Sequence, residues 1–408
     1  MEASDFISCR RHIIIKKGIL TMAKKSGNSN VVQMKKKKRT LGILNVDFIL
    51  LFTVLVLLVI GLTMLFSTSS AANMSSGRVY APIAKQAAVA AIGLAFMFAI
   101  STFVDYKVLK KYSFAAYLAI GVLMILVAFI GMDSHGARRQ IAVPFIGSLQ
   151  PSEFSKYIMI LTLATRLSVI KKGSLKTWKE LLLNLAIVGG PVAICLLLQR
   201  HASAALVHLF VGGVMLVAAG ADWGKLLPVG LVGGGAIGAI ILATGFRMDR
   251  ITGFLNKSAD VQGNNWQATQ AIYAVGSGGL FGLGLGNSRQ KYSYLPEAEN
   301  DYIFAIVGEE LGFIGSVFIV LLFCIVIWRG ITIALNCKDA FGTYTAFGIT
   351  VLTGFQVAIN MWVVLRLMPS TGMQLPLFSL GGSSMLVTLT GFGILLAISR
   401  ENLKNKGK

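Results

Sequence analysis

Long apolar segments alternate with polar connections along the chain from residue 46 to residue 398. Each segment has close to the ~20 residues that a helix needs to cross a lipid bilayer. Because the segments contain few charges, the pattern predicts transmembrane helices rather than the amphipathic helices of a soluble protein. The ten predicted segments are 46–67, 82–103, 113–132, 153–170, 181–199, 202–220, 226–245, 302–328, 341–364 and 376–398.

The composition supports the same fold class. Of the 408 residues, 55% are hydrophobic and only 13% are charged, and the mean hydropathy is +0.72, which is far too apolar for a soluble chain of this length. We therefore predict an all-α polytopic membrane protein with ten transmembrane helices. The four cysteines have no C-x-x-C spacing and no histidine partners, so neither a zinc site nor a disulfide framework is indicated.

The basic residues predict the orientation in the membrane. A net charge of +21 would suggest a nucleic-acid partner in a soluble protein. In a membrane protein, however, Lys and Arg collect on the cytoplasmic side, so no nucleic acid is expected. Residues 1–45 are predicted to be a disordered basic cytoplasmic tail, 46–398 the ten-helix domain and 399–408 a second basic cytoplasmic tail.

This orientation puts the longest connection on the outer face. Residues 246–301 form a large extracellular loop between the seventh and eighth predicted helices, and 135–152 and 366–375 are also polar and rich in Gly, Pro and Ser. Function is therefore expected on the outer face. No internal repeat or inverted pair of broken helices is evident, which disfavours a secondary transporter.

A charged loop turns abruptly into a long apolar helix near residue 301. Glu297, Glu299 and Asp301 stand at this edge. We expect Asp301 in the first turn of the helix, where the helix dipole stabilises an anion, so that its carboxylate can act as a general base.

Two further carboxylates lie deeper in the same helix. On an ideal helix, Glu309 lies ~80° around from Asp301 and ~12 Å deeper, whereas Glu310 falls on the opposite side. Intramembrane carboxylates are functional by default, but pairing that fixes helix packing is an equally good interpretation.

The first outer motif is Gly136–Lys156. Arg138 and Arg139 offer forked donors that suit phosphate oxygens. Glu153 and Lys156 are three residues apart on a helix, so they could form a structural pair or bind the polar part of a substrate.

The second motif is Trp266–Lys291. Its glycines match G-x-G-x-x-G at 282–286, but no strand–turn–helix unit is possible there, which excludes a dinucleotide site. We expect the glycines to shape a re-entrant or interfacial segment whose backbone can approach a ligand. Gln267 and Gln270 share a helical face and could hold sugar hydroxyls or cap helix ends.

The last motif is Pro369–Ser384, which interrupts the chain before the tenth predicted helix. Its small residues allow close helix packing or form a cavity wall. Ser383 and Ser384 could also line a site.

Together, GARRQ with QPSEFSK, the run from WQATQ to GNSRQK, YLPEAENDYIFAIVGEELG and PSTGMQLPLFSLGGSS resemble the SEDS family (shape, elongation, division and sporulation), which includes FtsW, RodA and SpoVE. GNSRQK, with FRMDRITGFLN at 246–256, looks closer to FtsW and SpoVE than to RodA. The resemblance implies a peptidoglycan glycosyltransferase that polymerises lipid II on the outer face of the cytoplasmic membrane, at the division septum. The implied partners are a class B penicillin-binding protein (a transpeptidase) and other divisome membrane proteins.

Three alternatives stay open: a lipid II flippase, a sporulation-specific paralogue and a non-catalytic divisome scaffold. The sequence also departs from the family at Gln140, usually Trp, at Gln199–Ser203 and at Glu299–Asn300, usually His-Thr. These departures concern the substrate contacts rather than the family.

The resemblance makes Asp301 the catalytic residue. It implies attack by the 4-hydroxyl of one lipid-linked disaccharide on the anomeric carbon of another, with inversion and loss of undecaprenyl diphosphate. No organic cofactor is expected, and a divalent cation, Mg or Mn, is a candidate for charge stabilisation. The expected substrate-binding residues are Arg138, Arg139, Glu153, Lys156, Arg247, Gln267, Gln270, Lys291, Glu297, Ser383 and Ser384.

Overall fold

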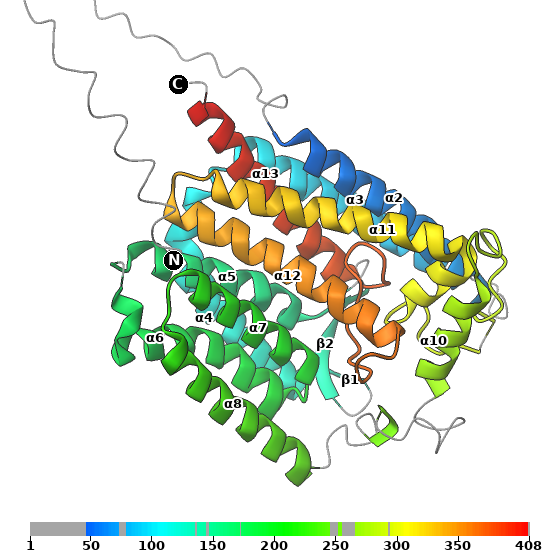
Figure 1. Ribbon diagram of the computed structural model, residues 1–408, viewed down its shortest axis with the longest axis horizontal. Coiled ribbons are helices and arrows are strands. Elements are labelled where there is room, and N and C mark those ends of the chain that lie inside the picture. Colours follow the sequence, from blue (N-terminus) through cyan, green and yellow to red (C-terminus); the bar gives the residue numbers. More distant parts are fainter. Residues whose placement is uncertain are drawn as a thin grey trace, which may run out of the picture. The chain divides into compact units, whose positions relative to one another are not determined.

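The computed structural model describes residues 46–72, 79–134, 137–143, 147–171, 173–244, 252–254, 266–292 and 294–406, and these residues are mostly helical (Figure 1). The predicted N-terminal tail lies outside them. The helices are α2 (Phe48–Ala72), α3 (Ala81–Phe103), α4 (Lys107–Ile130), α5 (Pro151–Val169), η2 (Ser174–Lys176), α6 (Trp178–Ala193) continued by the π-helix η3 (Ile194–Leu198), α7 (Ala202–Ala218), α8 (Trp223–Thr244), α10 (Trp266–Ser277), α11 (Ile303–Leu335), α12 (Ala340–Val364) and α13 (Gly382–Lys406).

Seven helices among the described residues are long and apolar enough to cross a membrane: α2, α3, α4, α6 with η3, α11, α12 and α13. Helix α7 is apolar but shorter, and α5 carries Glu153, Lys156 and Arg166. The prediction of a multi-pass membrane protein is confirmed. The count of ten crossings and the cytoplasmic location of both termini stay predictions.

The expectation of an all-α fold is wrong in one place, because the first outer motif forms a small antiparallel sheet. Strand β2 (Ala137–Val143) pairs with both β1 (Met132–Ser134) and β3 (Gly147–Leu149). The pairing satisfies backbone groups between α4 and α5 that would otherwise need water at the membrane edge.

Helix α11 is broken at Gly312, where φ is 67° and ψ is −166°. The segment 278–286 packs against this break. The N–H groups of Leu283 and Gly284 donate to the carbonyl oxygens of Glu309 (2.9 Å) and Glu310 (3.0 Å). On the other side of the break, the N–H groups of residues 313 and 314 donate to the carbonyl oxygens of residues 279 and 280. The segment therefore satisfies the backbone groups that the break releases.

Glycine is required where these two backbones meet. A Cβ on Gly278 would lie 2.0 Å from the Gly308 carbonyl oxygen, and one on Gly312 would lie 2.3 Å from the Gly282 nitrogen. The glycines of the second motif thus let its backbone approach α11. The predicted approach of this backbone to a ligand stays a prediction.

The last helix differs from its prediction at both ends. Residues 376–381 are not helical, and α13 continues to Lys406, eight residues beyond the predicted end. Arg400 is buried and donates to the carbonyl oxygens of Thr102 and Val104 at the end of α3, and Asn402 donates to Ile333 of α11 (3.0 Å). These contacts stabilise the extra helical turns.

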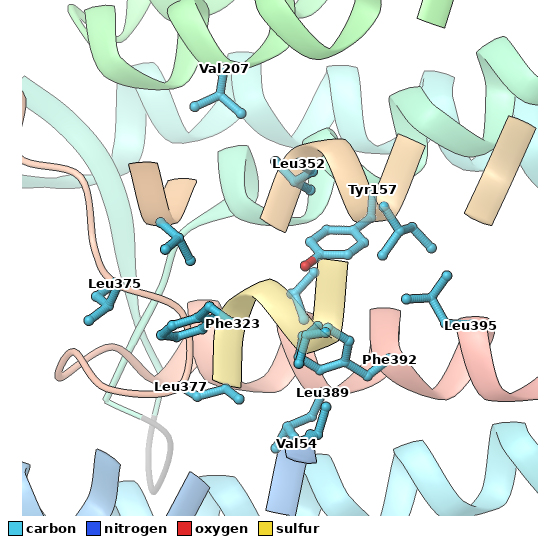
Figure 2. Packing of buried hydrophobic residues seen from close by; sticks show 14 of the residues in the cluster. Val54, Tyr157, Val207, Phe323, Leu352, Leu375, Leu377, Leu389, Phe392 and Leu395 are labelled. Carbon is cyan, nitrogen blue, oxygen red and sulfur yellow. The ribbon is translucent and has the colours of Figure 1, made fainter. Parts of the chain in front are cut away.

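A continuous hydrophobic core joins the helices, and Figure 2 shows part of it around Phe392 and Leu389 of α13. Helix α11 lies alongside α2 and α12, and α13 lies alongside α3 (Figure 1). The non-helical residues Leu375 and Leu377 enter the same core. The segment that precedes α13 is therefore fixed by packing as well as by hydrogen bonds.

Candidate active site

Asp301 lies in a turn directly before α11. The N-cap residue of α11 is Tyr302 and the helix begins at Ile303, so the expected position of Asp301 in the first helical turn is wrong. The Asp301 N–H donates to the Glu297 carbonyl oxygen (3.1 Å), and its own carbonyl oxygen accepts from Asn360 Nδ2 (2.9 Å). The main chain of Asp301 is thus held on both sides.

Asn360 is a residue that the sequence analysis missed. It is buried in α12, and its Nδ2 also donates to the Met373 carbonyl oxygen (2.8 Å). One amide therefore joins the turn of Asp301 to the last outer motif. The available signal was a single Asn within an apolar segment, since polar residues inside membrane helices are usually functional.

The neighbouring carboxylates stand in different surroundings. Glu297 is exposed, has a φ of 56° and accepts from Asn300 Nδ2 (2.5 Å). Glu299 is partly buried, and its main-chain oxygen accepts from the Leu380 N–H (2.8 Å). Burial, and to a smaller extent the nearby Glu297, raise the pKa of the Glu299 carboxyl.

Glu153 and Lys156 form an ion pair, which is one of the two interpretations that their spacing left open. Lys156 Nζ lies 2.7 Å from Glu153 Oε1, and Lys156 is buried. On the same helix, Ser155 bonds to His208 of α7 (2.7 Å). The pair satisfies its own charge, and its role toward a substrate stays a prediction.

Ser383 connects the first and last outer motifs. Its Oγ accepts from the Gln150 N–H (2.9 Å) and donates to the Ser148 carbonyl oxygen (3.0 Å). The next residue in the sequence, Ser384, is also buried. The structure gives Ser383 a packing role, and substrate binding by either serine stays a prediction.

Arg138 and Arg139 lie where β2 shifts its pairing with β1. Asp133 pairs with Arg138 and Met132 with Gln140, so Arg139 is the extra residue of a β-bulge. Arg138 is exposed and donates to the Phe129 carbonyl oxygen (2.9 Å), whereas Arg139 is partly buried. The two guanidinium groups therefore differ in burial, and their role toward a diphosphate stays a prediction. Arg247 lies outside the described residues.

Helix α10 carries Gln267 and Gln270, of which Gln270 is buried and Gln267 is partly buried. Trp266 at its start donates through Nε1 to the Tyr294 carbonyl oxygen (2.8 Å). The second motif is thereby joined to the loop that leads to Asp301.

Lys291 is buried and paired with Glu310 of α11 (3.0 Å), although the sequence predicted a residue that faces a substrate. The segment around it lines a cavity of about 600 Å³. The lining residues are Gly286, Asn287, Ser288, Arg289, Gln290, Tyr292 and Tyr294.

The acidic residues before α11 do not assemble a metal-binding group. Within the described ranges, no three His, Cys, Asp or Glu side chains are arranged to hold a metal ion. The candidate divalent cation stays a prediction, and we derive no chemical step through one.

Comparisons with known proteins give consistent results. The family model FTSW_RODA_SPOVE, described as a cell cycle protein, matches residues 48–404. Stage V sporulation protein E of Bacillus subtilis (strain 168) is 40% identical over 357 residues, which cover 87% of this chain and 97% of that protein. The probable peptidoglycan glycosyltransferase FtsW of Geobacter sp. (strain M18) is 37% identical over 358 residues, covering 86% of this chain and 96% of that protein.

Two solved structures share the fold. A chain from a peptidoglycan synthase complex that coordinates polymerization and crosslinking aligns with a TM-score of 0.72 at 26% identity, covering 88% of this chain and 99% of that chain. The rod shape determining protein RodA of Thermus thermophilus aligns with a TM-score of 0.66 at 26% identity and the same coverage. The likeness therefore extends over nearly all of the described helices.

Proposed function

The chain belongs to the family of FtsW, RodA and SpoVE cell cycle proteins and is a peptidoglycan glycosyltransferase, and we propose that it polymerises lipid II on the outer face of the cytoplasmic membrane. One observation carries this proposal. Hydrogen bonds connect the first, second and last motifs with the charged loop that contains Asp301. The Gln150 N–H bonds to Ser383, the Leu380 N–H bonds to Glu299, and the Trp266 indole bonds to Tyr294. Stretches that are far apart in the sequence thus form one connected unit that includes Asp301.

In the proposed reaction, the 4-hydroxyl oxygen of one lipid-linked disaccharide attacks the anomeric carbon of another. A new C–O glycosidic bond forms as the bond from that carbon to the diphosphate breaks, and the configuration inverts. Asp301 takes the proton of the attacking hydroxyl, and undecaprenyl diphosphate leaves with the bonding electron pair. General-base catalysis of this kind contributes roughly 10²- to 10⁴-fold in rate.

The remaining polar residues have supporting roles in the proposal. Guanidinium groups stabilise the departing diphosphate through charge-assisted hydrogen bonds, and amides and hydroxyls bind the sugars. The diphosphate-binding groups are Arg138, Arg139 and Arg247. The sugar-binding and orienting groups are Glu153, Lys156, Gln267, Gln270, Glu297, Ser383 and Ser384.

We further propose ten membrane crossings with both termini in the cytoplasm, a class B penicillin-binding protein as partner, and action at the division septum. The similarity to a chain from a peptidoglycan synthase complex supports the partner. A sporulation-specific role is a second candidate, and the 40% identity to stage V sporulation protein E supports it. Depletion distinguishes the two, since only a division enzyme is needed for septa in growing cells.

A flippase is a weaker alternative. It would use Glu309, Glu310 and Asp47 as intramembrane relays. The carboxylates of Glu309 and Glu310, however, are buried and accept hydrogen bonds from residues 288–291, and Asp47 is buried and paired with Arg329. In the loop before α11, by contrast, Glu297 is exposed and Glu299 and Asp301 are partly buried. This distribution favours chemistry at the outer edge of the membrane.

The direct test is polymer formation from lipid II by the purified protein, alone and with its penicillin-binding partner. We expect glycan strands from the wild type and none from Asp301→Asn. Lipid II movement across vesicles without any polymer, with the partner present, would contradict the proposal and support the flippase.

A further inference from the structure

Lys291 has no N–H donor left for a substrate. Its Nζ bonds to Gly286 O (2.7 Å), Ser67 Oγ (3.0 Å) and Glu310 Oε1 (3.0 Å), and an ammonium group has three donors. Only 3% of its side chain is exposed. The charge of Lys291 is therefore satisfied within the protein.

Glu310 completes this cluster from α11. Its side chain is fully buried, and its carboxylate also accepts from Ser67 Oγ (2.7 Å) and from the Ser288 N–H (3.4 Å). Ser67 belongs to α2, so the cluster joins α2, α11 and the segment that contains Lys291. A single buried ion pair thus connects three parts of the chain.

Glu309 binds the same segment from the adjacent position of α11. Its carboxylate accepts from Ser288 Oγ (2.5 Å) and from the N–H groups of Arg289 (2.9 Å) and Gln290 (3.3 Å). Residues 288–291 are therefore anchored to α11 by two neighbouring carboxylates. This explains how Glu309 and Glu310 act on one segment although they leave the helix on different sides.

The contacts of residues 288–291 with Glu309 and Glu310 lie at one end of the loop 291–301, and Asp301 lies at the other end. Within this region, the Leu295 N–H donates to the Gln290 carbonyl oxygen (3.0 Å), and the Asp301 N–H donates to that of Glu297 (3.1 Å). Glu310 is seven positions after Ile303 in α11, which corresponds to about 10 Å along a helix. The loop is thus closed over two turns of α11, and its shape depends on both attachments.

We propose that Lys291, Glu310 and Ser67 are positioning residues, which hold the loop 291–301 and thereby Asp301 against α11, and that Lys291 is not a ligand of the substrate diphosphate. This inference rests on the proposed function of Asp301. A buried ion pair that loses one partner leaves an uncompensated charge, whereas apolar replacement of both partners is often tolerated. The two roles of Lys291 therefore predict different results for single and double variants.

The test compares Lys291→Met, Glu310→Met and the double variant by kcat and KM for lipid II polymerisation on folded protein. Displacement of a catalytic group by about 1 Å can cost 10²-fold. We expect each single variant to lower kcat about 10- to 100-fold with little change in KM, and the double variant to recover most of the loss. If Lys291 bound the diphosphate, Lys291→Met and the double variant would be equally impaired with a raised KM, and Glu310→Met would be nearly normal.

The chain offers a matched control for this ion pair. Arg329 of α11 pairs with Asp47 directly before α2, so this ion pair also connects α11 to the α2 segment, but near the opposite end of the two helices. Arg329→Met is expected to leave kcat near the wild-type value. A loss equal to that of Lys291→Met would mean that any ion pair between these parts matters, and would overturn the specific role of Lys291.

Ser67→Ala tests the same cluster with both charges still paired, in case the charge variants do not fold. The hydroxyl of Ser67 bonds to two charged groups, and loss of a hydrogen bond to a charged group corresponds to roughly 12-fold or more. We expect kcat to fall by about 10-fold with an unchanged KM. An unchanged kcat would exclude Ser67 from the positioning residues.

A readout without activity separates this inference from the proposed function. A spin label at Glu297→Cys, in a background with the four native cysteines replaced by Ala, reports the mobility of the loop. Lys291→Met should increase this mobility and the double variant should restore it, even if the wild type makes no polymer. An identical spectrum in all variants would overturn the inference.

Discussion

The carboxylates before α11 are distinguished by their surroundings. Glu297 is exposed and hydrogen-bonded to Asn300, Glu299 is partly buried, and Asp301 lies in a turn whose backbone is held by Glu297 and Asn360. A fixed backbone reduces the motion that a general base must lose before it can accept a proton. These contacts support Asp301 as the base.

Asp301→Asn should abolish polymerisation while leaving membrane abundance and partner binding intact. Asn is nearly isosteric and keeps the backbone contacts, so a loss of at least roughly 10²-fold reports the missing base. Specific activity on purified protein, normalised to folded material, measures the effect. If the role of Asp301 were structural, the Asn variant would instead have a lower thermal stability and a normal specific activity. Near-normal polymer formation by the Asn variant would contradict the assignment of Asp301 as the general base.

Glu299 should make stability depend on pH. Because the pKa of its carboxyl is raised in the folded state, its contribution is fully present at acidic pH, below the usual carboxyl range, and is lost as the pH rises through the raised pKa. Glu299→Gln resembles the protonated form, so the variant should have the higher Tm at neutral pH and a flatter Tm profile.

Thermal unfolding in detergent from acidic to neutral pH measures this effect. Glu297→Gln is the control, since it removes the smaller cause of the shift and should move the loss of stability to lower pH. A lower Tm for Glu299→Gln than for the wild type at neutral pH would contradict the assignment.

At the scale of elements, the broken helix α11 and the glycine-rich segment 278–286 form one structural unit. The segment supplies hydrogen bonds to the backbone on both sides of Gly312. It then leads directly into residues 288–291, which bind Glu309 and Glu310. The break therefore helps to position the loop that carries Asp301.

Gly312→Ala should destabilise this unit. A Cβ at this position would combine a φ of 67° with a contact 2.3 Å from the Gly282 nitrogen, and strain with overpacking of this kind costs about 2 kcal/mol or more. We expect a clear fall in Tm, together with reduced polymerisation. Gly276→Ala is the matched control, because a Cβ there would meet no atom within 4 Å. Equal Tm values for the two variants would contradict this account.

The sequence predicted the helices well because each long apolar segment has to satisfy its own backbone within the membrane. It failed where hydrogen-bond partners are distant in sequence. Asn360 reaches Asp301 across 59 positions, and Ser67 meets Glu310 across 243. The strands of the first motif were also not predicted, because a short polar connection has no hydropathy pattern that distinguishes a hairpin from a loop.

The candidate site was predicted with the same limits. The resemblance pointed to Asp301, and the ion pair of Glu153 and Lys156 is one of the two interpretations that their spacing left open. The inward orientation of Lys291 could not be predicted, because basic residues on the outer side suggest phosphate ligands until their partners are known. Its partners Ser67 and Glu310 come from two other segments.

At the scale of the whole molecule, helices α2 and α11 are connected near both ends. Asp47 pairs with Arg329 near one end, and Ser67 contacts Lys291 and Glu310 near the other. The Asp47–Arg329 end lies next to the basic connections of the predicted cytoplasmic side. The end with Ser67, Lys291 and Glu310 lies next to the outer motifs. This division agrees with the predicted topology, which stays a prediction.

Cysteines at Asn287 and Thr177 should separate the two sides of the membrane. Both positions are exposed, and neither is in a membrane-spanning helix. In intact cells, and with the native cysteines replaced, we expect an impermeant thiol reagent to label Asn287→Cys but not Thr177→Cys. Both should be labelled after the cells are opened. Labelling of Thr177→Cys in intact cells would invert the topology.

The protein surface that faces the lipid should also contain the partner's binding site. Val317 and Phe318 lie on α11 after the break and are 37% and 51% exposed, and Phe347 of α12 is partly buried. Few charges interrupt this surface. A single apolar helix of a penicillin-binding protein could pack closely against it, and close packing drives helix association in membranes. A photo-crosslinking residue at Phe318 should therefore capture the partner in cells. Phe129 of α4, which is 64% exposed, is the control on a different helix, and a partner captured there and along α3 but never at Phe318 would contradict the predicted interface.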